Sequence, residues 1–199
     1  MNIAVFASGK GTNLSAIIRQ VKKGSLKVNI ALMVTDNPKA PAISRARRAG
    51  VKVVIITPKD FPDKKSFEAE VIDQLKQNNV DLVVLAGFML ILGPNLISAY
   101  KDKIINIHPA LLPSFKGASA IKDALDYGVK LTGVTVHFVD EKIDNGPIIM
   151  QEPVKIEEKD SLEILEKKIH RLEHKIYPKA IGLLAENRFK IENRKVVIL

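Results

Sequence analysis

Two polar residues, Asn106 and His108, have the types and the spacing expected of a catalytic site. They end an apolar run that begins at Ile104 and is followed by Pro109 and Pro113. Side chains two positions apart in a strand lie on the same face, and proline is not expected to continue a central strand. The pattern predicts a strand that ends with an amide donor and a titratable imidazole at the edge of a sheet.

A carboxylate is expected at the same edge. The polar loop at residues 140–147 follows another predicted strand and contains Asp144. An amide can stabilise a negatively charged oxygen, and an imidazole can hold or release a proton near neutral pH. Asn106, His108 and Asp144 together therefore predict a site that stabilises an oxyanion and moves a proton.

A second candidate site follows the first predicted strand, at Ser8-Gly-Lys-Gly-Thr-Asn13. Glycines let the backbone approach a ligand closely, and the N–H groups at a helix start favour an anion such as phosphate. A tight turn without a ligand explains the segment equally well. A dinucleotide fingerprint would need glycine at Leu14, so that match is incomplete. Asp36 could bind a ribose, but Asp36-Asn-Pro is interpreted as an ordinary turn.

Strands and helices alternate along the chain and must position these residues. Strands are predicted at residues 2–7, 28–34, 52–56, 81–85, 104–108, 131–139 and 148–156, and helices at residues 13–23, 40–49, 64–78 and 118–127. This alternation predicts an α/β, Rossmann-like, doubly wound fold with a mostly parallel sheet and helices on both faces. Ligands in such sheets bind at the carboxyl ends of strands, where the glycine turn, residues 86–89 and His108 all fall.

The C-terminal part is predicted to form a long helix and a small hairpin. Ser161 is placed to cap the helix, whose apolar residues recur at spacings of three and four. These residues are Leu162, Leu165, Ile169, Leu172 and Ile176. Glu173 is flanked by this stripe, where a carboxylate needs a partner. Residues 188–199 predict a hairpin, and Pro153 indicates an edge or a bulge in its strand.

Two histidine patterns are interpreted as non-catalytic. His170-Arg-Leu-Glu-His174 matches the H-x-x-E-H motif of inverted metallopeptidases, but few candidates for a third ligand follow it, so no metal site is expected. His137 lies between apolar residues in a predicted strand and is expected to be structural. The apolar residues 88–92 line a pocket or pack as ordinary core, and the sequence leaves both open.

Length and composition favour one domain spanning residues 1–199, with 46% hydrophobic residues to form its core. No apolar run reaches the roughly 18 residues of a membrane span, and no leader is recognised, so a cytoplasmic protein is expected. Zero cysteines exclude disulfides, thiolate ligands and a cysteine nucleophile. The net charge of +9 is spread without interleaved aromatic residues, so no nucleic acid partner is expected. The sequence does not indicate an oligomeric state.

Four motifs together resemble the phosphoribosylglycinamide formyltransferase family of folate-dependent enzymes. They are Ser8-Gly-x-Gly-Thr-Asn13, Ala86-Gly-Phe-Met89, Asn106-Ile-His-Pro-x-Leu-Leu-Pro113, and Gly133-Val-Thr-Val-His-x-Val-Asp140 with Asp144-x-Gly-Pro147. The resemblance covers nearly the whole chain. The third and fourth motifs also occur in relatives that use the same formyl donor, so they indicate formyl transfer more firmly than they indicate the acceptor.

The resemblance implies that 10-formyltetrahydrofolate donates its formyl group to the primary amine of glycinamide ribonucleotide, by direct attack and without a metal. It assigns catalysis to Asn106, His108 and Asp144. It assigns nucleotide binding to Gly11, Thr12, Asn13 and Glu173, and folate binding to Lys64, Met89, Leu90, Ile91, Leu92 and Asp140.

Departures from the family pattern concern substrate affinity. Lys64 and Leu90 replace arginines, Ala110 replaces a serine, and Lys10 stands where a small or neutral residue is common. The alternatives are a related 10-formyltetrahydrofolate enzyme with another acceptor, a hydrolase of that folate, and a non-catalytic nucleotide-binding module.

Overall fold

The computed structural model describes residues 1–199, which form two compact units, Met1–Ile105 and Asn106–Leu199. The single domain expected from the sequence stays a prediction. The boundary falls inside β5 (Ile104–His108), the strand that carries the candidate catalytic residues.

The first unit is built on a parallel sheet with the strand order β3-β2-β1-β4. Its strands are β1 (Asn2–Phe6), β2 (Asn29–Thr35), β3 (Val53–Ile55) and β4 (Leu82–Leu85). Residues 3–6 of β1 are completely buried. A strand that is covered on both faces must be apolar on both, which explains why β1 is a continuous apolar run.

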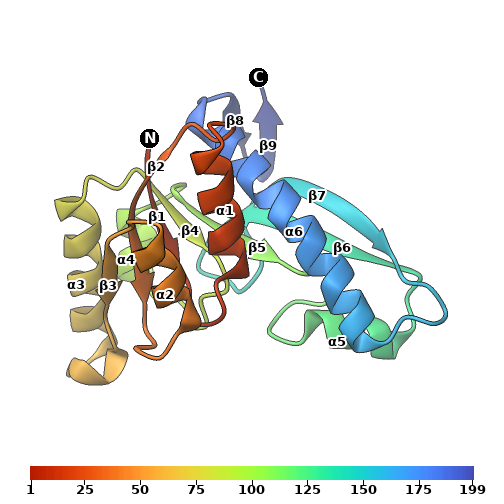
Figure 1. Ribbon diagram of the computed structural model, residues 1–199. Helices are drawn as coiled ribbons and strands as arrows, with labels where there is room; N and C mark the ends of the chain where they lie inside the picture. Colours follow the sequence, from red (N-terminus) through yellow and green to blue (C-terminus); the bar gives the residue numbers. More distant parts are fainter. The chain divides into compact units, whose positions relative to one another are not determined.

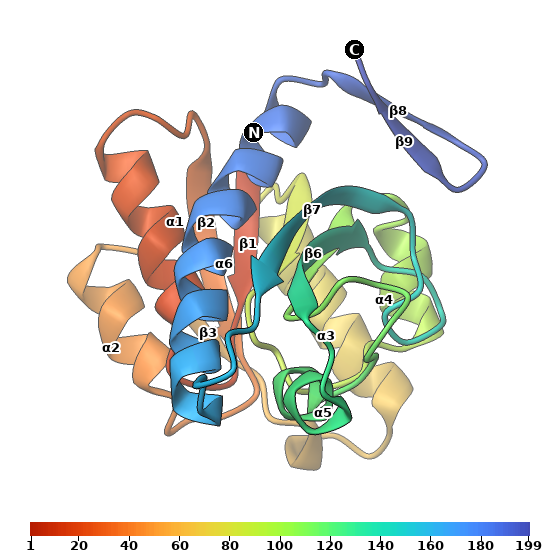
Figure 2. The same cartoon turned by 90° about the vertical axis from the view of Figure 1, so that its right-hand side faces the viewer.

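Two pairs of helices cover this sheet, one pair on each face (Figures 1 and 2). They are α1 (Thr12–Lys22) with α2 (Pro41–Arg48), and α3 (Lys64–Gln77) with α4 (Pro94–Ala99). A short 3₁₀ helix, η1 (Pro58–Asp60), precedes α3. The predicted crossovers on both faces are confirmed. Neither α4 nor η1 was predicted, because α4 has six residues and buries only Leu96, too little for a periodic pattern.

The second unit continues from the end of β5 and has the strand order β6-β7-β9-β8. Its elements are α5 (Ala120–Tyr127), β6 (Leu131–Phe138), β7 (Ile148–Lys155), α6 (Leu162–Ala185), β8 (Phe189–Glu192) and β9 (Lys195–Ile198). β6 and β7 are antiparallel, β7 and β9 are parallel, and β8 and β9 form the predicted terminal hairpin (Figure 2). The α/β fold with a mostly parallel sheet is confirmed.

The position of Pro153 agrees with its interpretation as an edge residue. Pro153 lies opposite Gly133 of β6, whereas β9 pairs with β7 at Ile148. Proline has no N–H to donate, so it is tolerated where β7 has a partner strand on one side only.

The long helix α6 packs on β6 and β7 and also contacts α5 (Figure 2). Ser161 caps it as predicted, since its side chain accepts a hydrogen bond of 3.3 Å from the N–H of Ile164. Leu165, Ile169 and Ile176 are buried together with Glu173. The predicted apolar stripe therefore faces the sheet and takes a carboxylate with it.

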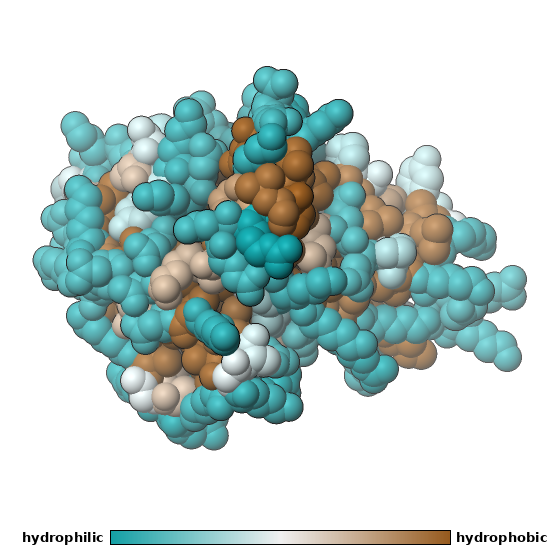
Figure 3. Space-filling model, turned by 90° about the horizontal axis from the view of Figure 1, so that it is seen from above, coloured by the Kyte–Doolittle hydropathy of each residue, from teal (hydrophilic) through white to brown (hydrophobic).

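Hydrophilic residues cover most of the face shown in Figure 3, where apolar residues form separate areas. Two lysines pair with a carboxylate one turn away on the same helix, Lys122 with Asp126 in α5 and Lys167 with Glu163 in α6. The side chains of both pairs are exposed to solvent. No helix in the structure has both the length and the apolar character that a bilayer span requires.

The cap of α6 can be tested by replacing its serine. Ser161→Ala should lower the free energy of unfolding by about 1 kcal/mol, because the N–H of Ile164 loses its acceptor. Urea denaturation measures the change. Ser119→Ala is the matched control, since Ser119 occupies the same position before α5 but makes no capping bond with its side chain. Equal losses in both variants would show that the cap contributes nothing.

Candidate active site

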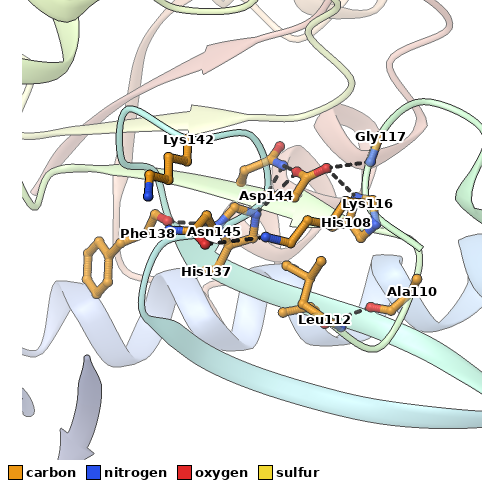
Figure 4. A network of polar contacts seen from close by, with 12 residues as sticks. His108, Ala110, Leu112, Lys116, Gly117, His137, Phe138, Lys142, Asp144 and Asn145 are labelled. Atoms are coloured by element: carbon orange, nitrogen blue, oxygen red, sulfur yellow. Dashed lines mark hydrogen bonds and ion pairs between the residues drawn. The ribbon is translucent and has the colours of Figure 1, made fainter. Parts of the chain in front are cut away.

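The three residues predicted to be catalytic lie together in the second unit. Nδ2 of Asn106 is 3.5 Å from Oδ1 of Asp144. Nδ1 of His108 is 3.4 Å from Oδ2 of the same carboxylate (Figure 4). Asn106 and His108 both reach Asp144 because β5 places them on one face. The loop after β6 supplies the carboxylate from the other side.

The hydrogen bonds of His108 identify the ring nitrogen that titrates. Nε2 lies 2.7 Å from the carbonyl oxygen of Phe115. A carbonyl oxygen only accepts hydrogen bonds, so Nε2 carries a proton in both charge states. Nδ1, which faces Asp144, is therefore the nitrogen that gains and loses a proton.

Burial governs the acidity of His108, whose exposed fraction is 3%. Burial lowers its pKa, and the nearby His137 lowers it further, whereas Asp144, the Phe115 carbonyl and Glu173 raise it. The net effect is a pKa below the ordinary value for histidine. Asp144 favours the charged imidazole as the sequence predicted, but burial is the larger effect. A proton on Nδ1 is consequently given up readily near neutral pH.

Asp144 remains ionised in the same surroundings. Burial raises its pKa, but the nearby His137, the N–H of Gly117 and the charge of His108 together bring it below the ordinary value. The N–H of Gly117 donates to Oδ2 at 2.8 Å. The carboxylate is thus held from the loop after β5 while it faces the imidazole.

The loop that carries Asp144 follows a path that explains the Asp-x-Gly-Pro motif. A Cβ atom at Gly146 would lie 1.8 Å from the carbonyl oxygen of Phe138, so only glycine fits. Asp144 itself has a φ of 46°, in the left-handed region. Asp140 shapes the same loop, since its carboxylate accepts from the N–H of Lys142 at 3.0 Å and from Nδ2 of Asn145 at 2.9 Å.

His137 belongs to the cluster, although the sequence indicated only a structural residue. Its Nδ1 donates to the carbonyl oxygen of Phe138 at 2.7 Å, which leaves Nε2 as an acceptor in the neutral ring. Nε2 lies 3.3 Å from Nδ2 of Asn106 and 3.7 Å from Oδ1 of Asp144. His137 therefore fixes which end of the Asn106 amide faces the site. The sequence contained one signal of this role. Thr135 and His137 lie two positions apart, so they share one face of β6 while the valines beside them face the other side.

The loop after β5 is held by two side chains that sequence reasoning did not select. The hydroxyl of Thr135 donates to the carbonyl of Ala110 at 2.6 Å and accepts from the N–H of Leu112 at 3.1 Å. Gln151 donates to the carbonyl of Leu112 at 2.9 Å. These bonds fix the loop that presents backbone groups to the imidazole and the carboxylate.

Glu173 lies on the buried face of α6 and pairs with His170, whose Nδ1 is 2.9 Å from its Oε2. Its charge raises the pKa of the His108 imidazole. In Tyr177 burial raises the pKa of the hydroxyl, and Glu173 raises it further. Within the H-x-x-E-H motif, the first histidine is thus paired with the motif's own glutamate. No group of three or more potential metal ligands occurs in residues 1–199.

The glycine turn in the first unit presents the start of α1. Gly11 has a φ of 68°, and a Cβ there would lie 2.7 Å from Cβ of Ala42, so glycine is required. No side chain caps α1, and its first turn, which begins with Thr12 and Asn13, contains no acidic residue. An uncapped helix start without nearby negative charge suits an anion.

The predicted folate loop lies between β4 and α4. Met89 and Ile91 are 69% and 65% exposed, so the interpretation of these residues as ordinary core is wrong. Phe88 does pack in the core, with its ring centroid 5.1 Å from that of Phe6. Lys64, at the exposed start of α3, belongs to the same unit.

An amide, an imidazole and a carboxylate gathered beside a strand end of an α/β sheet have the chemistry to stabilise an oxyanion and to move a proton. Residues 1–181 match the family model described as "Formyl transferase". This chain belongs to the formyl transferase family.

Individual relatives cover this chain closely. A phosphoribosylglycinamide formyltransferase of Bacillus subtilis (strain 168) is 47% identical over 181 residues, which are 91% of this chain and 93% of that protein. The trifunctional purine biosynthetic protein adenosine-3 of Gallus gallus is 40% identical over 96% of this chain, which spans 19% of that protein.

Solved structures of related enzymes also resemble this chain over its whole length. Glycinamide ribonucleotide transformylase 1 from Symbiobacterium toebii has a TM-score of 0.98 and 43% identity, covering 100% of this chain and 94% of that one. A formyltetrahydrofolate deformylase from Pseudomonas syringae pv. tomato str. DC3000 has a TM-score of 0.92 and 30% identity, covering 100% of this chain and 65% of that one.

The influence of Asp144 on His108 can be measured without any substrate. Asp144→Asn keeps the shape of the side chain but removes the charge that raises the pKa of His108, so this pKa should fall further. A histidine-ring NMR titration measures it. Asp126→Asn is the control, because Asp126 is an exposed residue of α5 that pairs with Lys122. An unchanged pKa of His108 in Asp144→Asn would show that the two side chains are not coupled.

Proposed function

We propose that this protein transfers the formyl group of 10-formyltetrahydrofolate to the primary amine of glycinamide ribonucleotide. The observation that carries the proposal is the cluster of Asn106, His108 and Asp144, with His137 holding the amide of Asn106. Family membership and the 47% identity to a phosphoribosylglycinamide formyltransferase support the choice of donor and acceptor.

The reaction needs two things from the protein. The amine nitrogen attacks the formyl carbon and forms a tetrahedral intermediate with a negatively charged oxygen. The bond from carbon to N10 of the folate then breaks, the amine nitrogen loses a proton, and N10 gains one. The site must stabilise the oxygen and carry the proton, and the products are tetrahydrofolate and the formylated nucleotide.

Asn106 is the donor to the oxyanion in this proposal. Its amide nitrogen is oriented by the 3.3 Å contact with Nε2 of His137, whereas its contact with Asp144 is 3.5 Å and therefore weak. The N–H directed toward Asp144 is thus the one that can turn to a developing negative charge. A donor that is already oriented needs little reorganisation when the charge forms.

His108 moves the proton through Nδ1. Its Nε2 stays on the Phe115 carbonyl, and its lowered pKa makes Nδ1 a ready donor to N10. Asp144, ionised and 3.4 Å away, stabilises the imidazolium while it carries the proton. An ordered water beside Asp144 completes the transfer from the amine.

The remaining substrate contacts follow the family pattern. Gly11, Thr12 and Asn13 bind the phosphate at the start of α1, and Glu173 binds the amine of the nucleotide. The folate is bound by the loop at residues 89–92, by the backbone beside Asp140, and by Lys64 at the glutamate tail. No metal takes part in the proposed reaction, since the donor is already activated.

The direct test is to supply purified protein with both substrates and to follow tetrahydrofolate formation. Release of tetrahydrofolate should require glycinamide ribonucleotide. Release at the same rate without the amine would identify a hydrolase, the second candidate that the likeness to a formyltetrahydrofolate deformylase favours.

Replacing the cluster should remove the chemistry in a characteristic way. His108→Ala should lower kcat by about 10²–10⁴, the range for a positioned acid or base, and Asn106→Ala by about 10²–10³, the range for an oxyanion donor. The double variant His108→Ala with Asp144→Asn should lose much less kcat than the product of the two single fold-losses, because both residues act through one imidazole. Fully multiplicative losses would mean that Asp144 orders the loop only.

Of the two substrates, Glu173 should affect the binding of the nucleotide and not that of the folate. Glu173→Ala should raise KM for glycinamide ribonucleotide several-fold with little change in KM for the folate, because the amine loses a buried carboxylate partner. Steady-state kinetics with each substrate varied in turn measures both constants. Glu166→Ala, an exposed glutamate on the same helix, is the control. Equal increases in both KM values would contradict the assignment.

A further inference from the structure

The loop at residues 89–93 has no regular structure, and the apolar side chains of Met89 and Ile91 extend into solvent. Apolar side chains stabilise a conformation only when they are buried, so Met89 and Ile91 do not fix the loop by packing. The loop is fixed by hydrogen bonds at its two ends, and both bonds come from buried side chains of the first unit.

Ser8 holds the first end of the loop. It is 7% exposed, and its hydroxyl oxygen accepts from the N–H of Met89 at 2.9 Å while the hydroxyl donates to Oδ1 of Asp36 at 2.5 Å. Its backbone is engaged as well, with its N–H donating to the carbonyl of Gly87 and its carbonyl accepting from Nδ2 of Asn37. One residue thus ties together the loops that follow β1, β2 and β4.

Glu68 of α3 holds the second end. Its Oε1 accepts from the N–H of Gly93, its exposed fraction is 1%, and its Oε2 is buried without a hydrogen-bond partner. A Cβ at Gly93 would meet the ends of the Glu68 and Lys64 side chains, so any other residue there would displace Glu68 from this contact. Burying a carboxylate with one oxygen unsatisfied is unfavourable, which argues that Glu68 serves the loop and not the stability of the core.

We propose that Ser8 and Glu68 are positioning residues that clamp the folate loop at both ends, and that Ser8 joins this loop to the phosphate-binding turn. The inference rests on the proposed function for the identity of the two ligands. Ser8 directly precedes the turn Gly9–Asn13, so a shift of its hydroxyl moves both loops. The hydrogen bond of Glu68 reaches the end of the folate loop and not the phosphate-binding turn.

The two clamps therefore predict different kinetic patterns. Ser8→Ala removes the acceptor of the Met89 N–H and should raise KM for both substrates about three- to tenfold, the change expected for one hydrogen bond. Glu68→Ala should raise KM for the folate by a similar factor and leave KM for the nucleotide near its original value. Glu68→Gln keeps an acceptor for Gly93 and should recover much of the lost folate affinity.

Matched controls lie on the same elements or nearby. Glu70→Ala removes a glutamate of α3 that bonds only Gln74, and Ser25→Ala removes a serine hydroxyl that bonds Gln20. Neither variant should change either KM. A rise in both KM values in every variant, controls included, would indicate general destabilisation and overturn the proposal.

Amide hydrogen exchange tests the clamp without substrates. In the free protein, Ser8→Ala should lower the protection of the Met89 amide, and Glu68→Ala that of the Gly93 amide, each without changing the other core amides. Loss of protection with the predicted KM changes supports the proposal, and loss of protection with unchanged KM values overturns it. If the unaltered protein does not turn over the two substrates, the proposed function fails, while the exchange data still decide whether the clamp exists.

Discussion

The active-site unit depends on the burial of one carboxylate. Asp144 is ionised and largely withdrawn from water, and such a charge is tolerated only when donors surround it. β5 contributes Asn106 and His108, and the loop after β5 contributes the N–H of Gly117. The backbone path of this unit is therefore the path that brings three groups to one carboxylate.

The orientation of the polar groups follows from fixed acceptors in the backbone. The carbonyl of Phe138 requires a proton on Nδ1 of His137, which makes Nε2 an acceptor and turns the amide nitrogen of Asn106 toward it. The carbonyl of Phe115 acts in the same way on Nε2 of His108. Two carbonyl oxygens thus decide the proton positions of two imidazoles and the direction of one amide before any substrate binds.

Local patterns predicted most of the fold, because buried strands and amphipathic helices have distinct periods. The grouping of Asn106, His108 and Asp144 was also predicted, since the first two share one face of a strand that ends at a proline and the third stands in a polar loop that follows another strand. The contact of His137 with Asn106 was not predicted, because a histidine within an apolar strand looks like any buried residue. The groups contributed by Phe115 and Gly117 are backbone atoms, which no side-chain pattern reveals. Glu68 was missed because its burial depends on the chain near Gly93, far along the sequence.

At Asp144 the backbone lies in the left-handed region, where the residue that best fits the fold differs from the residue that the proposed reaction needs. A φ of 46° is tolerated by aspartate and asparagine, and glycine adopts it at no steric cost. A chain selected only to remain folded would have reason to replace the aspartate here, since the replacement would also remove a buried charge. Asp144 is thus retained for its part in the proposed reaction, at a cost in thermal stability. Attempts to stabilise this enzyme should begin well away from this loop.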